Sequence, residues 1–259
     1  MTGNRLAGIL AAMDVVDLRE FYASRLGNTT RRLIASRLRP KFGALGGATV
    51  MGLGFASPYM TEGLEEARHG FAFMMARQGV IHWPAEGPVQ SALVEEFDLP
   101  LLESTVDLAL VVHGLELTDT PDEMLKEIWR VMAPQGRLLL VVPNRRGLWA
   151  RVDSSPFGFG QPFSRPQLAS LLREAQFSVL SWSQALYMPP INRAAVLSMA
   201  GALEAFGSRA ISALSGVIIV EAVKQVYAIS SGKRLRRLAP RMRPVLTPAP
   251  ARRDRWENS

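Results

Sequence analysis

Two apolar runs in the chain end in residues that could bind a small molecule. The first, residues 48–53, leads into a Gly-x-Gly turn formed by Gly52 and Gly54, and the second, residues 106–112, is followed directly by His113. Glycine has no Cβ, so the backbone N–H groups of such a turn can come close to a nucleotide-like ligand. The motif is weak by itself because the chain contains 21 glycines, and a tight strand–helix turn without a ligand is the alternative.

Two neighbouring arginines form a second group of residues that could bind a ligand. Arg145 and Arg146 follow a predicted strand over residues 137–143 and precede Trp149. Their guanidinium groups could hold an anionic substrate, with Trp149 beside it. A solvated loop is the alternative interpretation.

Tyr22 and His113 each have a chemical and a structural interpretation. Tyr22 lies on a predicted N-terminal helix and could close over a ligand or belong to the core. For His113 a capping or packing role is favoured over that of a catalytic base, so no catalytic residue is assigned.

Strands that alternate with helices must position these residues. The spacing of apolar residues predicts helices over 14–39, 58–67, 121–132, 164–175 and 194–212, and strands over 48–53, 71–75, 89–94, 108–112, 137–143, 177–186 and 216–229. We expect the first helix to break at Gly27-Asn28 and to end at Arg39-Pro40. The alternation predicts a mostly parallel α/β sheet, with a reversed pair of strands at the end of the chain.

Composition limits the class of site and of partner. The chain has no cysteine and three histidines, which excludes disulfides and thiolate metal sites, so we expect no metal. Residues 233–259 hold nine basic and two acidic residues, which account for the whole net charge of +7. We expect this tail to be disordered and to be the part that contacts a polyanion or an acidic partner, if one exists. No secretory signal or apolar stretch of ~18 residues is visible, so we expect no membrane span and a cytoplasmic location.

Three blocks carry a resemblance to a known family. They are a Leu-Pro turn followed by an aspartate-headed strand at 99–110, a linker at 113–121, and a helix ending in Arg-Val-Met-Ala-Pro-Gln-Gly at 125–136. In this order they resemble the class I S-adenosylmethionine-dependent methyltransferases, especially the small-molecule subgroup called type 11. The resemblance covers residues 45–230, between N-terminal helices at 1–44 and the tail at 231–259. It implies a Rossmann-like sheet of seven strands, mostly parallel, with helices on both faces and the last strand antiparallel.

The resemblance also implies how S-adenosylmethionine would bind as cofactor. Gly52 and Gly54 would approach its amino-acid part, His113 would face its methionine part, and Tyr22 would cover it. A side chain added at Gly54 is therefore expected to block the ligand without disturbing the fold.

The adenosine part would lie at the ends of the second and third strands. Glu95 would be near the adenine amino group, Glu96 and Phe97 would frame the ring, and Met75 stands where the family has an acid for the ribose hydroxyls. Because this acid is missing, we expect an affinity weaker than micromolar. The function implied is a methyltransferase of unknown substrate, and the alternative is a non-catalytic methyltransferase-like protein that acts through a partner.

Overall fold

The structure, a computed structural model, describes residues 13–60, 66–153, 155–210 and 212–225. The chain divides into one compact unit of residues 1–226 and a second unit of residues 227–259, and the predicted basic tail lies outside the described residues. Within the described part, no helix has the combination of length and apolar character needed to cross a membrane.

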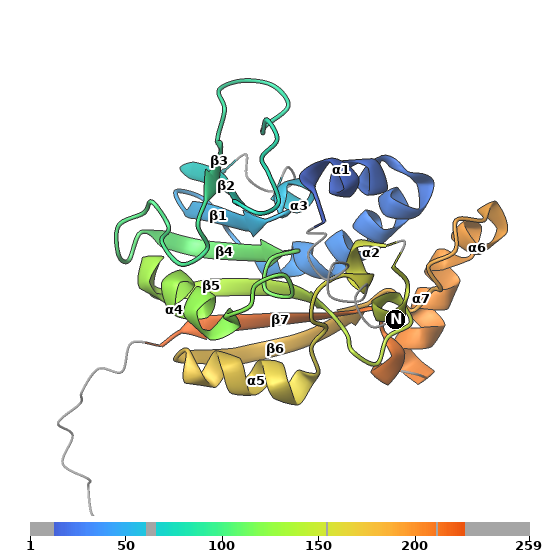
Figure 1. The fold of residues 1–259 in the computed structure, drawn as a ribbon. Coiled ribbons are helices and arrows are strands. Elements are labelled where there is room, and N and C mark those ends of the chain that lie inside the picture. The colour runs from blue at the N-terminus through green and yellow to red at the C-terminus, as the bar shows by residue number, and fades with distance from the viewer. Residues whose placement is uncertain (1–12, 61–65, 154, 211, 226–259) are drawn as a thin grey trace, which may run out of the picture. The chain divides into compact units, whose positions relative to one another are not determined.

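A seven-stranded sheet forms the centre of the first unit, in the order β3-β2-β1-β4-β5-β7-β6 (Figure 1). Strand β7 pairs antiparallel with both β5 and β6, and the other pairs are parallel. This arrangement confirms the predicted Rossmann-like sheet with its reversed final pair. The strands are β1 (Thr49–Gly54), β2 (His69–Met75), β3 (Ser91–Val94), β4 (Val106–Val112), β5 (Met132–Pro143), β6 (Phe177–Ala185) and β7 (Val217–Lys224).

Helices cover the sheet on both faces. Helices α4 (Pro121–Val131) and α5 (Arg165–Glu174) pack on one face, and α1 (Val15–Ala23), α2 (Arg25–Phe42) and α3 (Ser57–Met60) pack on the other. Successive residues of β4 join opposite core clusters, because a strand buried on both sides alternates between them. The remaining helical segments are α6 (Ala194–Ser198), α7 (Ala200–Ala210) and the 3₁₀ turns η1 (Trp149–Arg151), η2 (Pro156–Gly158) and η3 (Ser212–Leu214).

The N-terminal helices differ from the prediction at their junction. The break lies at Ser24, not at Gly27-Asn28, because the Ser24 hydroxyl accepts a hydrogen bond from the Gly27 N–H at 3.0 Å and caps α2. Gly27 belongs to the first turn of α2, where a Cβ would lie 1.9 Å from the carbonyl oxygen of Phe21. Glycine therefore permits the close approach of α1 and α2 and does not end a helix here.

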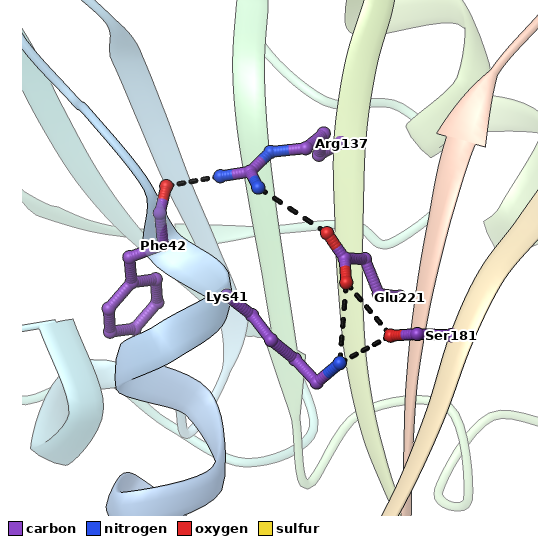
Figure 2. A network of polar contacts seen from close by, with 5 residues as sticks. All are labelled: Lys41, Phe42, Arg137, Ser181 and Glu221. Atoms are coloured by element: carbon purple, nitrogen blue, oxygen red, sulfur yellow. Dashed lines mark hydrogen bonds and ion pairs between the residues drawn. The ribbon is translucent and has the colours of Figure 1, made fainter.

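The end of α2 also differs from the prediction, since the helix continues through Pro40 to Phe42. A polar network holds this last turn on the sheet (Figure 2). In it the Glu221 carboxylate accepts from Ser181 at 2.9 Å and lies 3.3 Å from both Lys41 and Arg137. Arg137 also donates to the Phe42 carbonyl, and Lys41 to the Ser181 hydroxyl. These contacts join α2 to β5, β6 and β7 and outweigh the local tendency of Pro40 to end the helix.

Replacing Glu221 by alanine is expected to lower the free energy of unfolding by about 3 kcal/mol, because Lys41 and Arg137 would lose their shared carboxylate. Chemical denaturation measures this loss. The matched control is Asp122→Ala, which breaks an exposed ion pair with Lys126 and should leave the unfolding midpoint almost unchanged. Equal midpoints for the two variants would show that the network does not hold α2.

Candidate functional site

The carboxyl ends of β1, β2 and β4 meet at one edge of the sheet, where open α/β sheets bind ligands. Gly54 at the end of β1 pairs with Val112 of β4, and His113 follows directly. Met75 ends the neighbouring strand β2 and is fully buried. Tyr22 reaches the same edge from α1 through its contact with His113. The fold thus brings together these predicted residues from distant parts of the sequence.

Both glycines of the Gly-x-Gly turn are required by the packing of the protein itself. Gly54 has φ +77°, and a Cβ there would lie 2.4 Å from the carbonyl oxygen of Val112. A Cβ at Gly52 would lie 2.2 Å from the sulfur of Met60 and 2.9 Å from Cβ of Ala56. The expectation that a side chain at Gly54 would spare the fold is therefore wrong, because the added atom would meet backbone. A cofactor contact at these glycines stays a prediction.

A buried chain of polar side chains crosses this edge. The Tyr59 and Tyr22 hydroxyls are 2.9 Å apart, the Tyr22 hydroxyl is 2.8 Å from His113 Nε2, and His113 Nδ1 is 3.3 Å from Glu116 Oε1. With the proton of neutral His113 on Nδ1, facing the Glu116 carboxylate, Nε2 is free to accept from Tyr22. The arrangement is that of a histidine oriented by a carboxylate.

Both tyrosine side chains of this polar chain are protonated, as donation of hydrogen bonds toward His113 requires. Burial, reinforced by Tyr59 and Glu116, raises the pKa of Tyr22 well above its ordinary value. Burial also raises the pKa of Tyr59, although the hydrogen bond with Tyr22 opposes the shift. Both hydroxyls therefore keep their protons at neutral pH and can donate along the chain toward His113.

Aromatic side chains cover this chain of polar residues. The Tyr22 ring stacks on Phe55 at 5.7 Å between centroids, and the Phe157 ring lies 4.8 Å from that of His113. Trp149 packs edge-on against Phe157, is fully buried, and donates its indole N–H to the Met188 carbonyl at 2.7 Å. Trp149 thus packs behind Phe157 and holds that ring against His113. These rings exclude water from the polar chain beneath them.

A second set of polar side chains lies in the turns that follow β2 and β3. The Gln78 side chain donates to the His113 carbonyl at 2.6 Å, and Glu96 lies 3.3 Å from Arg77. Glu96 is 1% exposed, whereas Glu95 beside it is exposed and Phe97 is 37% exposed. Of the residues predicted for the adenine ring, only Glu96 points into the protein.

Several buried oxygens at this edge accept no hydrogen bond from the described residues. They are Gln78 Oε1, Glu96 Oε1 and both carboxylate oxygens of Glu116. Glu96 Oε1 and Glu116 Oε1 make only the 3.3 Å ion-pair contacts with Arg77 and His113 given above, so Gln78 Oε1 and Glu116 Oε2 are the two without any polar partner among the described residues. Leaving a buried acceptor without a donor is costly, so such groups mark a place where a ligand or water supplies donors. Sequence reasoning missed Gln78 and Glu116. A signal was available for Glu116 alone, because it lies three residues after His113 within a matched linker.

Arg145 and Arg146 lie in the loop after β5, and both are exposed. Arg145 donates to the Pro162 carbonyl at 3.2 Å. The structure therefore separates these two surface arginines from Trp149, which was predicted to act with them and lies in the core.

Comparisons with known proteins agree with this architecture. Residues 72–140 match a family model described as a methyltransferase domain. No curated protein sequence matches the chain.

Among solved structures, a putative methyltransferase from Haloferax volcanii, in complex with the Trm112 methyltransferase activator, has a TM-score of 0.58 and 17% identity over 83% of this chain and 100% of that one. Geranyl diphosphate C-methyltransferase from Streptomyces coelicolor has a TM-score of 0.53 and 13% identity, covering 73% of this chain and 78% of that one. The (4+2)-cyclase SpnF has a TM-score of 0.53 and 21% identity, covering 76% and 81%.

The chain has the Rossmann-like fold that these methyltransferase structures share. Together with the family-model match, this fold confirms the predicted resemblance to the class I S-adenosylmethionine-dependent methyltransferases. Since a cyclase shares the fold, the reaction must be argued from the site.

Proposed function

We propose that the chain is an S-adenosylmethionine-dependent methyltransferase whose cofactor binds at the carboxyl ends of β1 to β4. The observation that carries the proposal is the set of buried oxygens on Gln78, Glu96 and Glu116 that accept no hydrogen bond from the described residues. Glu96 Oε1 and Glu116 Oε1 have only ion-pair contacts, at 3.3 Å, with Arg77 and His113. S-adenosylmethionine offers an ammonium group, an adenine amino group and two ribose hydroxyls as donors, and it carries a positive sulfonium. Acceptors and carboxylates are the groups that such a ligand requires.

The residues fit the cofactor in the following way. Gln78 follows the end of β2 by three residues, so its side-chain oxygen would supply a ribose acceptor that Met75 lacks. Glu96 would serve the adenosine part from the end of β3. Glu116 would face the positively charged methionine part, beside His113.

When bound, the cofactor supplies an electrophilic methyl group. The chain's own part is to orient an acceptor and to receive its proton. Glu116 holds His113 with Nδ1 protonated, so Nε2 could take a proton from the acceptor once the Tyr22 hydroxyl moves away. Phe55 and Phe157 would keep water out of the site. Because Tyr22 and α1 cover His113, the site must open at α1 for ligands to enter.

A cavity of about 630 Å³ beside α1 offers a place for the methyl acceptor. Phe21 and Phe159 line it together with Asp17, Glu20 and Asp153. Phe21 also packs against Tyr22 and Phe157, the rings that cover His113. Phe21 therefore links the lining of the cavity to the rings that cover His113.

Hydrogen–deuterium exchange with and without S-adenosylhomocysteine tests this placement. Slower exchange is expected after the ends of the strands, at residues 76–79, 95–98 and 113–117. Helix α5, on the far edge of the opposite face, serves as the internal control and should exchange at the same rate. Protection confined to other segments would overturn the proposed site, and protection without methyl transfer to any acceptor would favour the non-catalytic alternative.

A further inference from the structure

The turn that follows β2 contacts two parts of the candidate site at once. Gln78 in this turn is 3% exposed, and its side-chain Nε2 donates to the His113 carbonyl at 2.6 Å. Its backbone carbonyl accepts from the N–H of Val15, the first residue of α1, at 2.8 Å. Gly79 beside it lies so close to α1 that a Cβ there would be 3.2 Å from Cγ1 of Val15. Gln78 therefore links the end of β4 to the helix that carries Tyr22.

The backbone of His113 depends on support from its neighbours. His113 has φ +50°, in the left-handed region that residues other than glycine adopt at a cost. Such a conformation persists only where surrounding contacts hold it. The buried hydrogen bond from Gln78 is one of these contacts, and it fixes the carbonyl group next to the imidazole ring. The position of the ring, and of the Nε2 atom that faces Tyr22, therefore depends on Gln78.

This hydrogen bond also determines the orientation of the Gln78 amide. A carbonyl oxygen only accepts, so the amide nitrogen must face His113 and the amide oxygen must lie on the other side. That oxygen, Oε1, is buried and accepts no hydrogen bond from the described residues. A glutamine with a purely structural role would leave a costly gap at this atom. A ribose hydroxyl of the proposed cofactor is the donor that would fill it.

We propose that Gln78 is a positioning residue that transmits occupation of the ribose position to His113 and to α1. A hydrogen bond accepted by the amide oxygen polarises the amide group and strengthens the bond that its nitrogen donates. Ribose binding thus holds the His113 ring more firmly, and the same turn holds the start of α1 through Val15. The inference rests on the proposed cofactor site. It adds that the residue which receives the ribose also positions the proposed base.

Nuclear magnetic resonance of the full-length protein, labelled with ¹⁵N at histidine, tests the proposal. The chain has three histidines, so the imidazole signals are few, and a His113→Asn variant assigns those of His113. Adenosine is the probe, because it carries the ribose but no methionine part that could contact His113. We expect adenosine to shift the His113 signals. Of 2′-deoxyadenosine and 3′-deoxyadenosine, the one that lacks the donor to Oε1 should bind about tenfold more weakly and leave the His113 signals unshifted.

Gln78→Met removes both polar ends of the amide at nearly constant volume. Adenosine should bind this variant about tenfold more weakly, and the two deoxy analogues should bind it as well as adenosine does. At saturation the shift of the His113 signals should be lost. Slower amide exchange of α1 on adenosine binding, expected in the wild type, should be lost as well. The matched control is Gln184→Met in β6, a half-buried glutamine that accepts from Tyr187, which should leave binding and signals unchanged.

The outcomes separate this inference from the proposed cofactor site. Equal affinity of the wild type for adenosine and both deoxy analogues would assign Oε1 to water and overturn the inference, while the cofactor site would stand. A His113 shift that Gln78→Met retains in full would overturn it too. The comparison of nucleosides needs no variant, so it decides the matter even if Gln78→Met fails to fold. Absence of adenosine and S-adenosylhomocysteine binding in the wild type would overturn the proposed site itself, and the inference with it.

Discussion

Gly54→Ala is expected to lower the free energy of unfolding by about 4 kcal/mol, enough to unfold a domain of ordinary stability. An L-residue in the left-handed region costs roughly 1–2 kcal/mol. The further loss arises because the new Cβ would lie 2.4 Å from the Val112 carbonyl oxygen and 2.7 Å from that of His113. These atoms belong to the backbone of β4 and its end, so they cannot move without separating β1 from β4. Chemical denaturation of the two proteins measures the difference.

Gly47→Ala is the matched control for this prediction. Gly47 has φ +76°, nearly the same as Gly54, but no atom lies within 4 Å of its added Cβ. Its substitution should cost only the backbone term of about 1–2 kcal/mol. If the two variants lose equal stability, the close contact between β1 and β4 does not explain the glycine.

Glu116→Gln is expected to weaken S-adenosylhomocysteine binding by about ten- to a hundredfold, the value of one charge-assisted hydrogen bond. The unliganded variant should keep nearly the stability of the wild type, because the amide oxygen of the new glutamine can still face His113 Nδ1 while a buried charge is removed. Glu96→Gln should weaken binding in the same way, with a small loss of stability because its ion pair with the partly exposed Arg77 is broken. Calorimetric titration gives the affinity, and thermal unfolding gives the stability.

Glu221→Gln is the control, since it is expected to change stability and not ligand binding. Its carboxylate has three partners in the network of Figure 2, far from the strand ends that hold Glu116. This variant should lose stability and bind the ligand as well as the wild type does. A Glu116→Gln variant that follows the same pattern would show that Glu116 is a structural carboxylate and not part of the site.

The sequence was sufficient to predict a mostly parallel sheet, and the family resemblance implied its seven strands with the last one antiparallel. Periodicity alone placed α4, and an apolar run between turn signals placed β4. The alternation of strands and helices fixed the parallel part of the sheet. The family-model match at 72–140 covers all three blocks in full. These features depend on residues that are close in the sequence, so local sequence patterns are enough to predict them.

The site was harder to predict because its parts meet only after folding. Two adjacent acids, Glu95 and Glu96, look equivalent in the sequence, and the turn after β3 decides that Glu96 is the buried one. Gln78 gave no signal, since its role depends on the contact between the β2 turn and His113. The prediction placed Trp149 beside a substrate with Arg145 and Arg146, but the 3₁₀ turn η1 directs it into the core.

Calorimetric titration of the full-length wild-type protein with S-adenosylhomocysteine tests the central claim most directly. We predict binding at one site with a dissociation constant of about 10 µM to 1 mM, because Gln78 replaces the charged ribose acceptor that Met75 lacks. S-adenosylmethionine should bind in the same range, and adenosine should compete with both. Absence of binding at about 10 mM ligand, roughly tenfold above the weakest dissociation constant predicted, would contradict the account.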